Sequence, residues 1–252
     1  MKCSDCGAEN SEWARNCGKC GKALAQQGDG SARSAAGMRP NEAAVEHRYI
    51  PGKMKLDYMH GIRDVTQKRL DALQGLLAHF RTPQLNIDAF LQDAATLISK
   101  QMSIDNVSIG LRDPKDGLYR YRAMVGFRDE AAEALKRIAY RKEQFYDDAN
   151  YVGSDISKQT RLYLAENNAP VEGEQDTFNR PVLLAMKRRT ALDSLEGDYI
   201  DVKIWGLYDD LLGWIELSGT RTMQFPDTNS IRWIETVASI IGIAVLFKPA
   251  RG

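Results

Sequence analysis

Cysteine is absent from this sequence after position 20, and histidine occurs only three times in 252 residues. The histidines, His47, His60 and His79, all precede the first segment patterned as a β-strand. A nucleophile in the later chain therefore has little to pair with. The sequence also lacks G-x-S-x-G, the P-loop and H-E-x-x-H. Together these absences predict that the protein is not an enzyme.

An excess of charge and a long apolar run are missing as well. The chain has 34 basic and 34 acidic residues, so no net field draws it toward polyanions or anionic lipid. Its longest apolar run, residues 240–247, is far shorter than the roughly 20 residues of a membrane span. Met1 leads directly into the first cysteine pair and leaves no place for a targeting sequence. We expect a cytoplasmic protein without membrane contact.

The four cysteines that are present form two C-x-x-C pairs separated by ten residues. They are Cys3, Cys6, Cys17 and Cys20. Thiolates spaced in this way can meet one tetrahedral ion at about 2.3 Å. Glycines beside them suit the positive φ of tight turns around sulfur: Gly7, Gly18 and Gly21. The pattern predicts one Zn²⁺ ion held by four thiolates.

Other uses of these cysteines fit less well. A redox pair is typically a single C-x-x-C beside a βαβ pattern, and two disulfides need an oxidising compartment that no signal peptide indicates. A catalytic zinc keeps an open coordination position, which four thiolates do not leave. A segment of about 22 residues buries too little apolar surface to fold alone. We therefore expect a structural ion that supplies the folding free energy.

The stretch from CSDCGAEN to NCGKCGKAL resembles the minimal zinc ribbon found at the ends of many bacterial and archaeal proteins. Such ribbons bind nucleic acid, bind protein or cap a chain. Residues 1–25 contain four basic and three acidic side chains, whereas DNA binding needs a clustered basic stripe. Protein contact or capping is therefore favoured over nucleic acid.

Composition and periodicity divide the rest of the chain. Residues 26–55 begin with QQGDGSARSAAG and read as a flexible linker. An apolar stripe from Met59 to Phe80 predicts a helix, and Asn86 is placed to cap a second one. Further segments are a strand at 107–112, a strand at 118–125, a helix at 131–138, a strand at 140–146, a hairpin at 200–204 and 211–218, and a helix capped by Asp227. Residues 147–195 read as long irregular loops.

This order predicts an α+β fold in which helices at both ends pack on one face of an antiparallel sheet. It resembles the GAF domain, a relative of PAS, over about residues 56–248, most clearly in GDYIDVKIWGLYDDLLGWIELSGT. Leu212-Gly213-Trp214-Ile215 matches the glycine step of the GAF closing hairpin. The N-K-F-D-E motif of cyclic-nucleotide binders and a cysteine for a bilin are both absent here, which disfavours those ligands.

A ligand would lie between the sheet and the loops at 147–195. Candidate lining residues are Tyr119, Tyr121, Trp205 and Trp214, with Arg120 and Arg122 as anion contacts on the opposite face. The alternative is that these aromatic residues only fill the core. The acidic pairs Asp147-Asp148 and Asp209-Asp210 fall in turns, where solvated carboxylates are usual.

The sequence therefore predicts a regulatory adaptor in which a GAF-like domain binds an unknown small molecule or protein partner and a zinc ribbon is tethered to it. We expect a homodimer formed through the Met59–Phe80 stripe and the helix at 231–247, because packed apolar helices can shift between two arrangements. Two alternatives stay open. One is a nucleic-acid-binding zinc-ribbon protein controlled by the second domain, and the other is a structural subunit without a ligand.

Overall fold

A computed structural model describes residues 2–10, 16–17, 19–20, 22, 24, 54, 65–82, 84–168 and 175–247. The chain divides into two compact units, Met1–Met54 and Lys55–Gly252. The predicted linker at 26–55, apart from Met54, lies outside the described residues. So do Gly18, Gly21, His47, His60 and the first turns of the stripe that begins at Met59.

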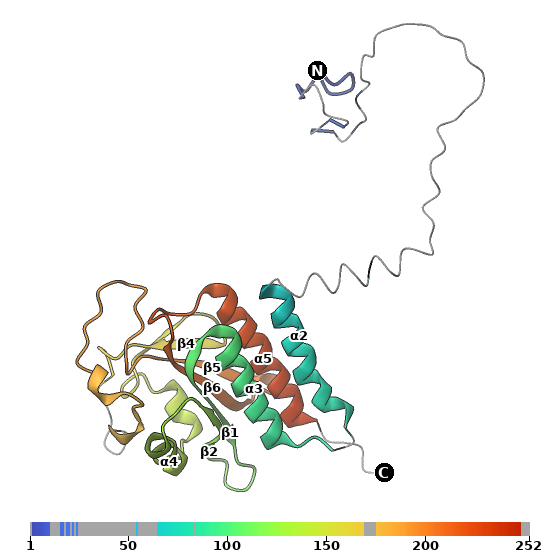
Figure 1. Ribbon diagram of the computed structural model, residues 1–252. Helices are drawn as coiled ribbons and strands as arrows, with labels where there is room; N and C mark the ends of the chain where they lie inside the picture. Colours follow the sequence, from blue (N-terminus) through green and yellow to red (C-terminus); the bar gives the residue numbers. More distant parts are fainter. Residues whose placement is uncertain are drawn as a thin grey trace, which may run out of the picture. The chain divides into compact units, whose positions relative to one another are not determined.

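The second unit contains helices and strands in mixed order (Figure 1). Its helices are α2 (Val65–Leu77), α3 (Ile87–Met102), α4 (Asp129–Arg137) and α5 (Thr228–Leu246). Its strands are β1 (Ile104–Arg112), β2 (Tyr119–Val125), β3 (Gly153–Asp155), β4 (Thr160–Tyr163), β5 (Tyr199–Trp205) and β6 (Leu211–Thr220). Short 3₁₀ turns are η2 (Ala78–Arg81), η3 (Lys142–Tyr146), η4 (Gln175–Thr177), η5 (Pro181–Leu183) and η6 (Leu207–Asp209).

The six strands form one sheet in the order β2-β1-β6-β5-β4-β3, and each neighbouring pair is antiparallel. The β1–β6 pairing joins the two ends of the domain, since it runs from Ile104 opposite Thr220 to Leu111 opposite Gly213. The hairpin β1–β2 is therefore joined to the rest of the sheet by the last described strand of the chain. The predicted α+β class with an antiparallel sheet is confirmed.

The two faces of the sheet have different coverings. On one face α3 and α5 pack against the strands, and α2 packs beside α3 (Figure 1). Fully buried residues of this layer include Phe90 and Ile98 from α3, Ile109 from β1, and Ile234 and Ile241 from α5. The other face is partly covered by α4, which contacts β2. The predicted placement of the terminal helices on one face is confirmed.

Side-chain caps begin two of the helices. The Asn86 side chain accepts a hydrogen bond from the Ala89 amide at 3.1 Å, at the start of α3. The Asp227 carboxylate accepts one from the Ser230 amide at 2.7 Å, at the start of α5. Each satisfies an amide that the first turn of a helix leaves without an intrahelical acceptor. Both caps follow from the sequence.

Helix α5 is long and apolar enough to cross a membrane by length and composition alone, and it is the one such helix among the described residues. Its side chains at Ile234, Val237 and Ile241 are fully buried against the sheet and α3. That burial accounts for its apolar character as a core helix. Part of its surface stays open, with Ile243 62% exposed.

Two predictions about the middle of the chain were wrong. Residues 140–146 do not form a strand: Tyr140 makes one isolated bridge to Tyr119, and η3 follows. Residues 147–195 are not only loops, because they contain β3 and β4. These strands have three and four residues, too few for an alternating pattern to stand out.

Two glycines let the central strands approach one another. A Cβ on Gly213 would lie 2.1 Å from the carbonyl oxygen of Gly110, so β6 needs glycine there to lie against β1. A Cβ on Gly110 would lie 2.1 Å from the indole ring of Trp214. Gly110 thus gives the Trp214 ring room to lie across the sheet. The predicted close backbone approach at Gly213 is confirmed.

Candidate functional site

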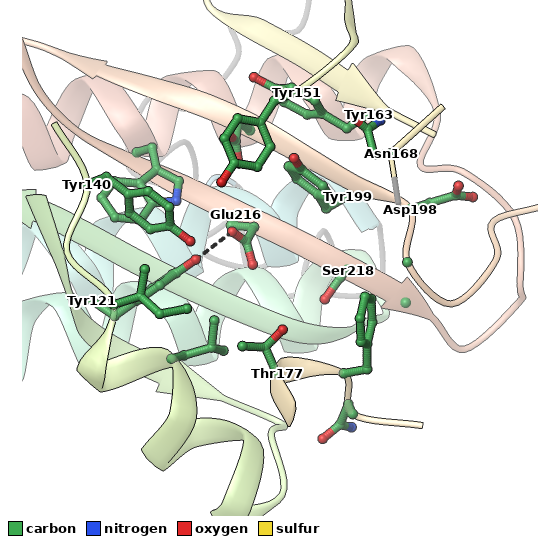
Figure 2. Close-up of a pocket in the computed structure, with 18 of the residues that line it drawn as sticks. Tyr121, Tyr140, Tyr151, Tyr163, Asn168, Thr177, Asp198, Tyr199, Glu216 and Ser218 are labelled. Carbon is green, nitrogen blue, oxygen red and sulfur yellow. Dashed lines mark hydrogen bonds between the residues drawn. The ribbon is translucent and has the colours of Figure 1, made fainter. Parts of the chain in front are cut away.

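The face of the sheet opposite α2, α3 and α5 contains a cavity of about 140 Å³ (Figure 2). Its floor is formed by β2, β5 and β6, and its walls by α4, η3, η4 and the segments that flank β3 and β4. Figure 2 shows the Glu216 carboxylate in its middle, between Tyr121 and Tyr140 on one side and Tyr199 on the other. The volume is room for on the order of ten water-sized groups.

One wall of the cavity is an aromatic cluster. The Trp214 ring lies edge to face with Tyr121 at 5.0 Å and with Tyr140 at 5.7 Å between ring centroids. Phe145 of η3 completes it at 5.0 Å from Trp214. Edge-to-face contacts of this kind stabilise aromatic clusters. Trp214 is only 1% exposed, so its ring is packed closely within this wall.

The opposite wall is a stacked pair of tyrosines. The rings of Tyr163 and Tyr199 lie 4.4 Å apart with 12° between their planes. They are cross-strand partners on β4 and β5. Burial, together with the nearby Asp201 charge, raises the pKa of both hydroxyls. Both rings are therefore neutral near pH 7 and present aromatic surface to the cavity.

Two carboxyl groups lie side by side on the cavity floor. Asp201 of β5 is the register partner of Glu216 of β6, so their side chains share one face. The Tyr121 hydroxyl donates to Glu216 Oε2 at 2.9 Å. Asp201 is 8% exposed, and its Oδ1 has no hydrogen-bond partner. Burial, followed by the neighbouring Glu216 charge, raises the pKa of Asp201 well above its ordinary value.

The other carboxylates that line the cavity are compensated by arginines. Arg188 Nη2 lies 2.8 Å from Asp198 Oδ1, and Arg180 Nε lies 3.1 Å from Glu196 Oε2. Asp198 also accepts amide hydrogen bonds from Ala165 and Leu195 and thereby holds two loops together. These two acids shape the rim of the cavity and already have cationic partners.

Two cationic side chains near Asp201 point to other partners. Arg161, opposite Asp201 on β4, donates through Nη2 to Asp148 and to the Gly153 carbonyl. Lys203 Nζ lies over the Tyr146 ring, 4.6 Å from its centroid. Their positive charges lower the pKa of Asp201 by less than its burial raises it. Neither residue is among the described residues that line the cavity.

The sequence-predicted aromatic residues separate into two groups. Tyr121 and Trp214 line the cavity. Tyr119 is fully buried beside it, where its hydroxyl donates to the Leu211 carbonyl at 2.7 Å. Trp205 packs against the same aromatic cluster without lining the cavity. A role in ligand binding stays a prediction for all of them.

Both predicted arginines form ion pairs away from the cavity. Arg120 binds Asp116 of the β1–β2 turn, with Nη2 2.7 Å from Oδ2. Arg122 reaches Asp88 at the start of α3, on the helical side of the sheet, at 2.5 Å. Neither lines the cavity. The arrangement thus brings no cation to the cavity from β2.

Sequence reasoning missed the residues that give the cavity its charge, Asp201 and Glu216. A signal was available for Asp201, because it alternates with the buried Ile200 and Val202 and so must face away from the helices. Segments distant in sequence, among them η3 and η4, form the walls over this part of the face, and the carboxyl group of Asp201 is buried beneath them.

The four cysteines of the first unit gather around one point. The Sγ atoms of Cys3 and Cys20 lie 3.7 Å apart and those of Cys6 and Cys17 lie 3.6 Å apart, and all four fall within 4.8 Å of one another. A tetrahedral Zn²⁺ with bonds of about 2.3 Å has sulfur–sulfur edges of about 3.8 Å. Disulfides are excluded in this structure by the same distances.

Local backbone geometry supports this cluster. Gly7 has a φ of +69°, as predicted, and its amide donates to the Cys3 carbonyl at 3.0 Å. The amides of Cys20 and Lys19 lower the pKa of the Cys17 thiol to about 6, and the Asn10 side chain donates to its sulfur at 3.5 Å. The donor set, its spacing and its amides fit a structural zinc ion. Among the described residues no other group of metal-binding side chains is of this kind.

No protein-family model matches the sequence, and neither does any curated protein. The chain is similar in structure to the GAF domain of an Acinetobacter phosphoenolpyruvate-protein phosphotransferase, with 13% identity, a TM-score of 0.46, and coverage of 73% of this chain and 96% of that one. It is also similar to the GAF domain of a phosphoenolpyruvate-protein phosphotransferase (ptsP) from Coxiella burnetii. The identity is 14% and the TM-score 0.45, and the match covers 71% of this chain and 92% of that one.

The chain is similar as well to the GAF domain of a putative sensor histidine kinase from Pseudomonas syringae pv. tomato. The identity is 11% and the TM-score 0.39, and the match covers 77% of this chain and 89% of that one. These neighbours belong to the family that the sequence resembles. At such low identities and TM-scores the similarity concerns the fold of the backbone and not the residues of a binding site. The ligands and activities of those proteins are therefore not carried over to this chain.

Proposed function

We propose that this chain is a non-enzymatic regulatory protein whose GAF-like domain binds a small molecule in the cavity on the open face of its sheet. The observation that carries this proposal is a preformed cavity, walled by aromatic rings, whose floor contains a buried carboxyl oxygen without a partner. A buried polar atom costs stability unless something satisfies it. Sites that accept such a cost are typically sites that bind a ligand.

The chemistry of the cavity favours binding over catalysis. Its described lining residues include neither histidine, cysteine, lysine nor arginine. Serine and threonine are present as Ser218 and Thr177, and a base such as histidine would be needed to activate either as a nucleophile. The Tyr121 hydroxyl is held by Glu216, and burial raises its pKa. We therefore assign the cavity a binding role.

The first unit, in this proposal, is a zinc ribbon with a structural role. Cys3, Cys6, Cys17 and Cys20 would hold one Zn²⁺, which draws together a segment too small to fold on an apolar core. Four thiolates leave no position for a substrate. The ribbon then serves as an attachment point for a protein partner.

The output of binding would pass through the helices that cover the far face of the sheet. Leu70 and Leu77 of α2 are 49% and 45% exposed, and Ile243 and Phe247 at the end of α5 are 62% and 42% exposed. Phe80 and Phe247 touch edge to face at 5.6 Å, which joins the ends of the two helices. We propose that these side chains form the homodimer contact with a second copy of the chain.

Light scattering tests the dimer with a matched pair of variants. Leu73 packs against the core, so the test uses the exposed positions, as Leu70→Glu with Leu77→Arg. The control is Leu207→Arg, at a residue 66% exposed in η6, the turn between β5 and β6. We expect a dimeric wild type, a dimeric control and a monomeric double variant. A monomeric wild type, or an unchanged mass in the double variant, would remove the dimer from the proposal.

Native mass spectrometry of freshly purified protein tests the binding role directly. The spectrum reports zinc, oligomer and retained small molecule together. We expect a zinc adduct and, under gentle activation, a small molecule that leaves the protein. Protein that neither retains a molecule nor shows a thermal shift with any compound of a broad metabolite collection contradicts the binding role.

A further inference from the structure

The electrostatics of the cavity floor restrict what can occupy it. Asp201 and Glu216 are register partners on adjacent strands, and two carboxylates that share a buried site raise each other's proton affinity. The arginines near the cavity do not line it, and they pair with Glu196, with Asp198 or with Asp148 outside the cavity. The described lining residues of the cavity thus contain four acids and neither lysine nor arginine, which disfavours an anionic ligand.

A divalent metal ion does not fit this floor. Such ions need several hard oxygen ligands in a defined geometry. Among the described residues, the four cysteines are the one cluster of three or more metal-binding side chains. Asp201 and Glu216 are surrounded instead by Tyr121, Tyr199 and Trp214. Ring faces are poor metal ligands.

Aromatic rings above a carboxylate are the environment that an organic cation prefers. The faces of Trp and Tyr carry negative potential, and quaternary ammonium groups bind in cages of such rings. Here Trp214 and Tyr140 approach from one wall and the Tyr163–Tyr199 stack forms the other. Asp201 lines the same cavity, and its buried Oδ1 has no hydrogen-bond partner.

We propose that the cavity binds a small monovalent organic cation, an amine or quaternary ammonium compound with an apolar body, whose charge lies between the Asp201–Glu216 pair and the aromatic walls. This inference rests on the proposed binding role and names its ligand class. Burial and the neighbouring Glu216 charge raise the pKa of Asp201, so a bound cation competes with a proton for the carboxyl pair. Affinity should therefore increase as the pH rises.

The facing groups determine how that titration proceeds. Glu216 opposes the charge on Asp201, and Lys203 and Arg161 favour it more weakly. Tyr163 and Tyr199 stay neutral because their pKa values are raised. The proton that is released therefore comes from the carboxyl pair.

Calorimetry with two probes of the same shape tests the inference. Choline contains a quaternary ammonium group, and dimethylbutanol is the isostere in which carbon replaces the nitrogen. We expect choline to bind the full-length protein at least about tenfold more tightly than dimethylbutanol, a ratio within the range of cation–π and ion-pair effects. Potassium chloride at equal ionic strength serves as the salt control. Repeating the titration in buffers of different ionisation enthalpy measures the proton release.

Variants locate the discrimination at the proposed residues. Asp201→Asn and Glu216→Gln keep size and remove charge, and each should reduce the choline preference to about threefold or less, given the usual strength of exposed cation–π contacts alone. Tyr199→Phe should keep the preference and Tyr199→Leu should lower it. Asp209→Asn, at an exposed turn residue outside the cavity, is the matched control and should bind like the wild type. Thermal melts establish that each variant is folded.

The outcomes separate this inference from the proposed function. Equal binding of choline and dimethylbutanol, or no binding of choline up to millimolar concentration, refutes the proposal that the ligand is an organic cation. If native mass spectrometry also releases a neutral or anionic molecule, the binding role stands while the ligand class is refuted. A choline preference that survives in both Asp201→Asn and Glu216→Gln refutes the assigned site.

Discussion

The pH dependence of stability in Asp201→Asn is the sharpest test of the buried carboxyl group. Asp201 is 8% exposed, has an oxygen without a partner and faces Glu216 across the β5–β6 ladder. Burial and the Glu216 charge raise its pKa well above the ordinary value, while Lys203 and Arg161 oppose the rise weakly. Asparagine has the same shape and does not titrate, so the substitution removes the pH-dependent cost and leaves the packing.

The sign follows from proton linkage. The folded state binds the Asp201 proton more tightly than the unfolded chain, whose aspartates titrate near about pH 3.9. The stabilisation by this proton is fully present below that pH and is lost as the pH rises through the raised native pKa. Between the two values the wild type should lose up to about 1.4 kcal/mol per pH unit relative to Asp201→Asn. Above the native pKa the difference levels off.

Urea unfolding of both proteins from about pH 4 to about pH 8 measures this difference. Tryptophan fluorescence is the signal, since Trp214 lines the same cavity. We expect the variant to gain stability relative to the wild type as the pH rises, and Asp209→Asn to follow the wild type at every pH. A wild-type–variant difference that stays constant with pH would show that Asp201 titrates normally, and the reasoning about the cavity floor would fail with it.

Two further predictions concern the sheet and the first unit. Gly213→Ala places a Cβ 2.1 Å from the Gly110 carbonyl oxygen and should lower the free energy of unfolding by about 1–3 kcal/mol, whereas Gly75→Ala in α2, which meets nothing within 4 Å, should raise it by up to about 1 kcal/mol. Denaturant curves that do not separate the two would contradict the packing described for β1 and β6. Elemental analysis of reduced protein should give one zinc ion per chain, which Cys17→Ser abolishes without changing the melting of the second unit; protein without stoichiometric metal refutes the zinc site.

Local patterns predicted much of the fold because local physics decides it. The caps at Asn86 and Asp227 depend on one side chain and the amide three residues later, so residue type is enough to find them. Each C-x-x-C pair is likewise recognised from four consecutive residues. The structure brings the four sulfur atoms of the two pairs together. Residues 107–112 of β1 and 199–205 of β5 alternate between aliphatic and other side chains, over a stretch long enough to recognise.

The middle of the chain was harder for the same reason. Strand β4 holds its place through pairing with β5, and β3 through pairing with β4. That pairing is a property of the partner strand and not of their own few residues. Residues 140–146 contain Tyr140, Phe145 and Tyr146, which favour a strand by composition. In the structure this segment forms a 3₁₀ turn instead, in which Phe145 packs against Tyr119 and Trp214.

By itself, the sequence determined the class of fold, the helix starts and the cysteine cluster, since each of these depends on residues close together in the chain. Only the tertiary structure decided where the charge of the cavity lies. Asp201 and Glu216 become neighbours through the antiparallel register of β5 and β6, and loops distant in sequence bury them. Burial and proximity together change a carboxyl group's proton affinity, and neither can be read from a residue's own sequence neighbourhood.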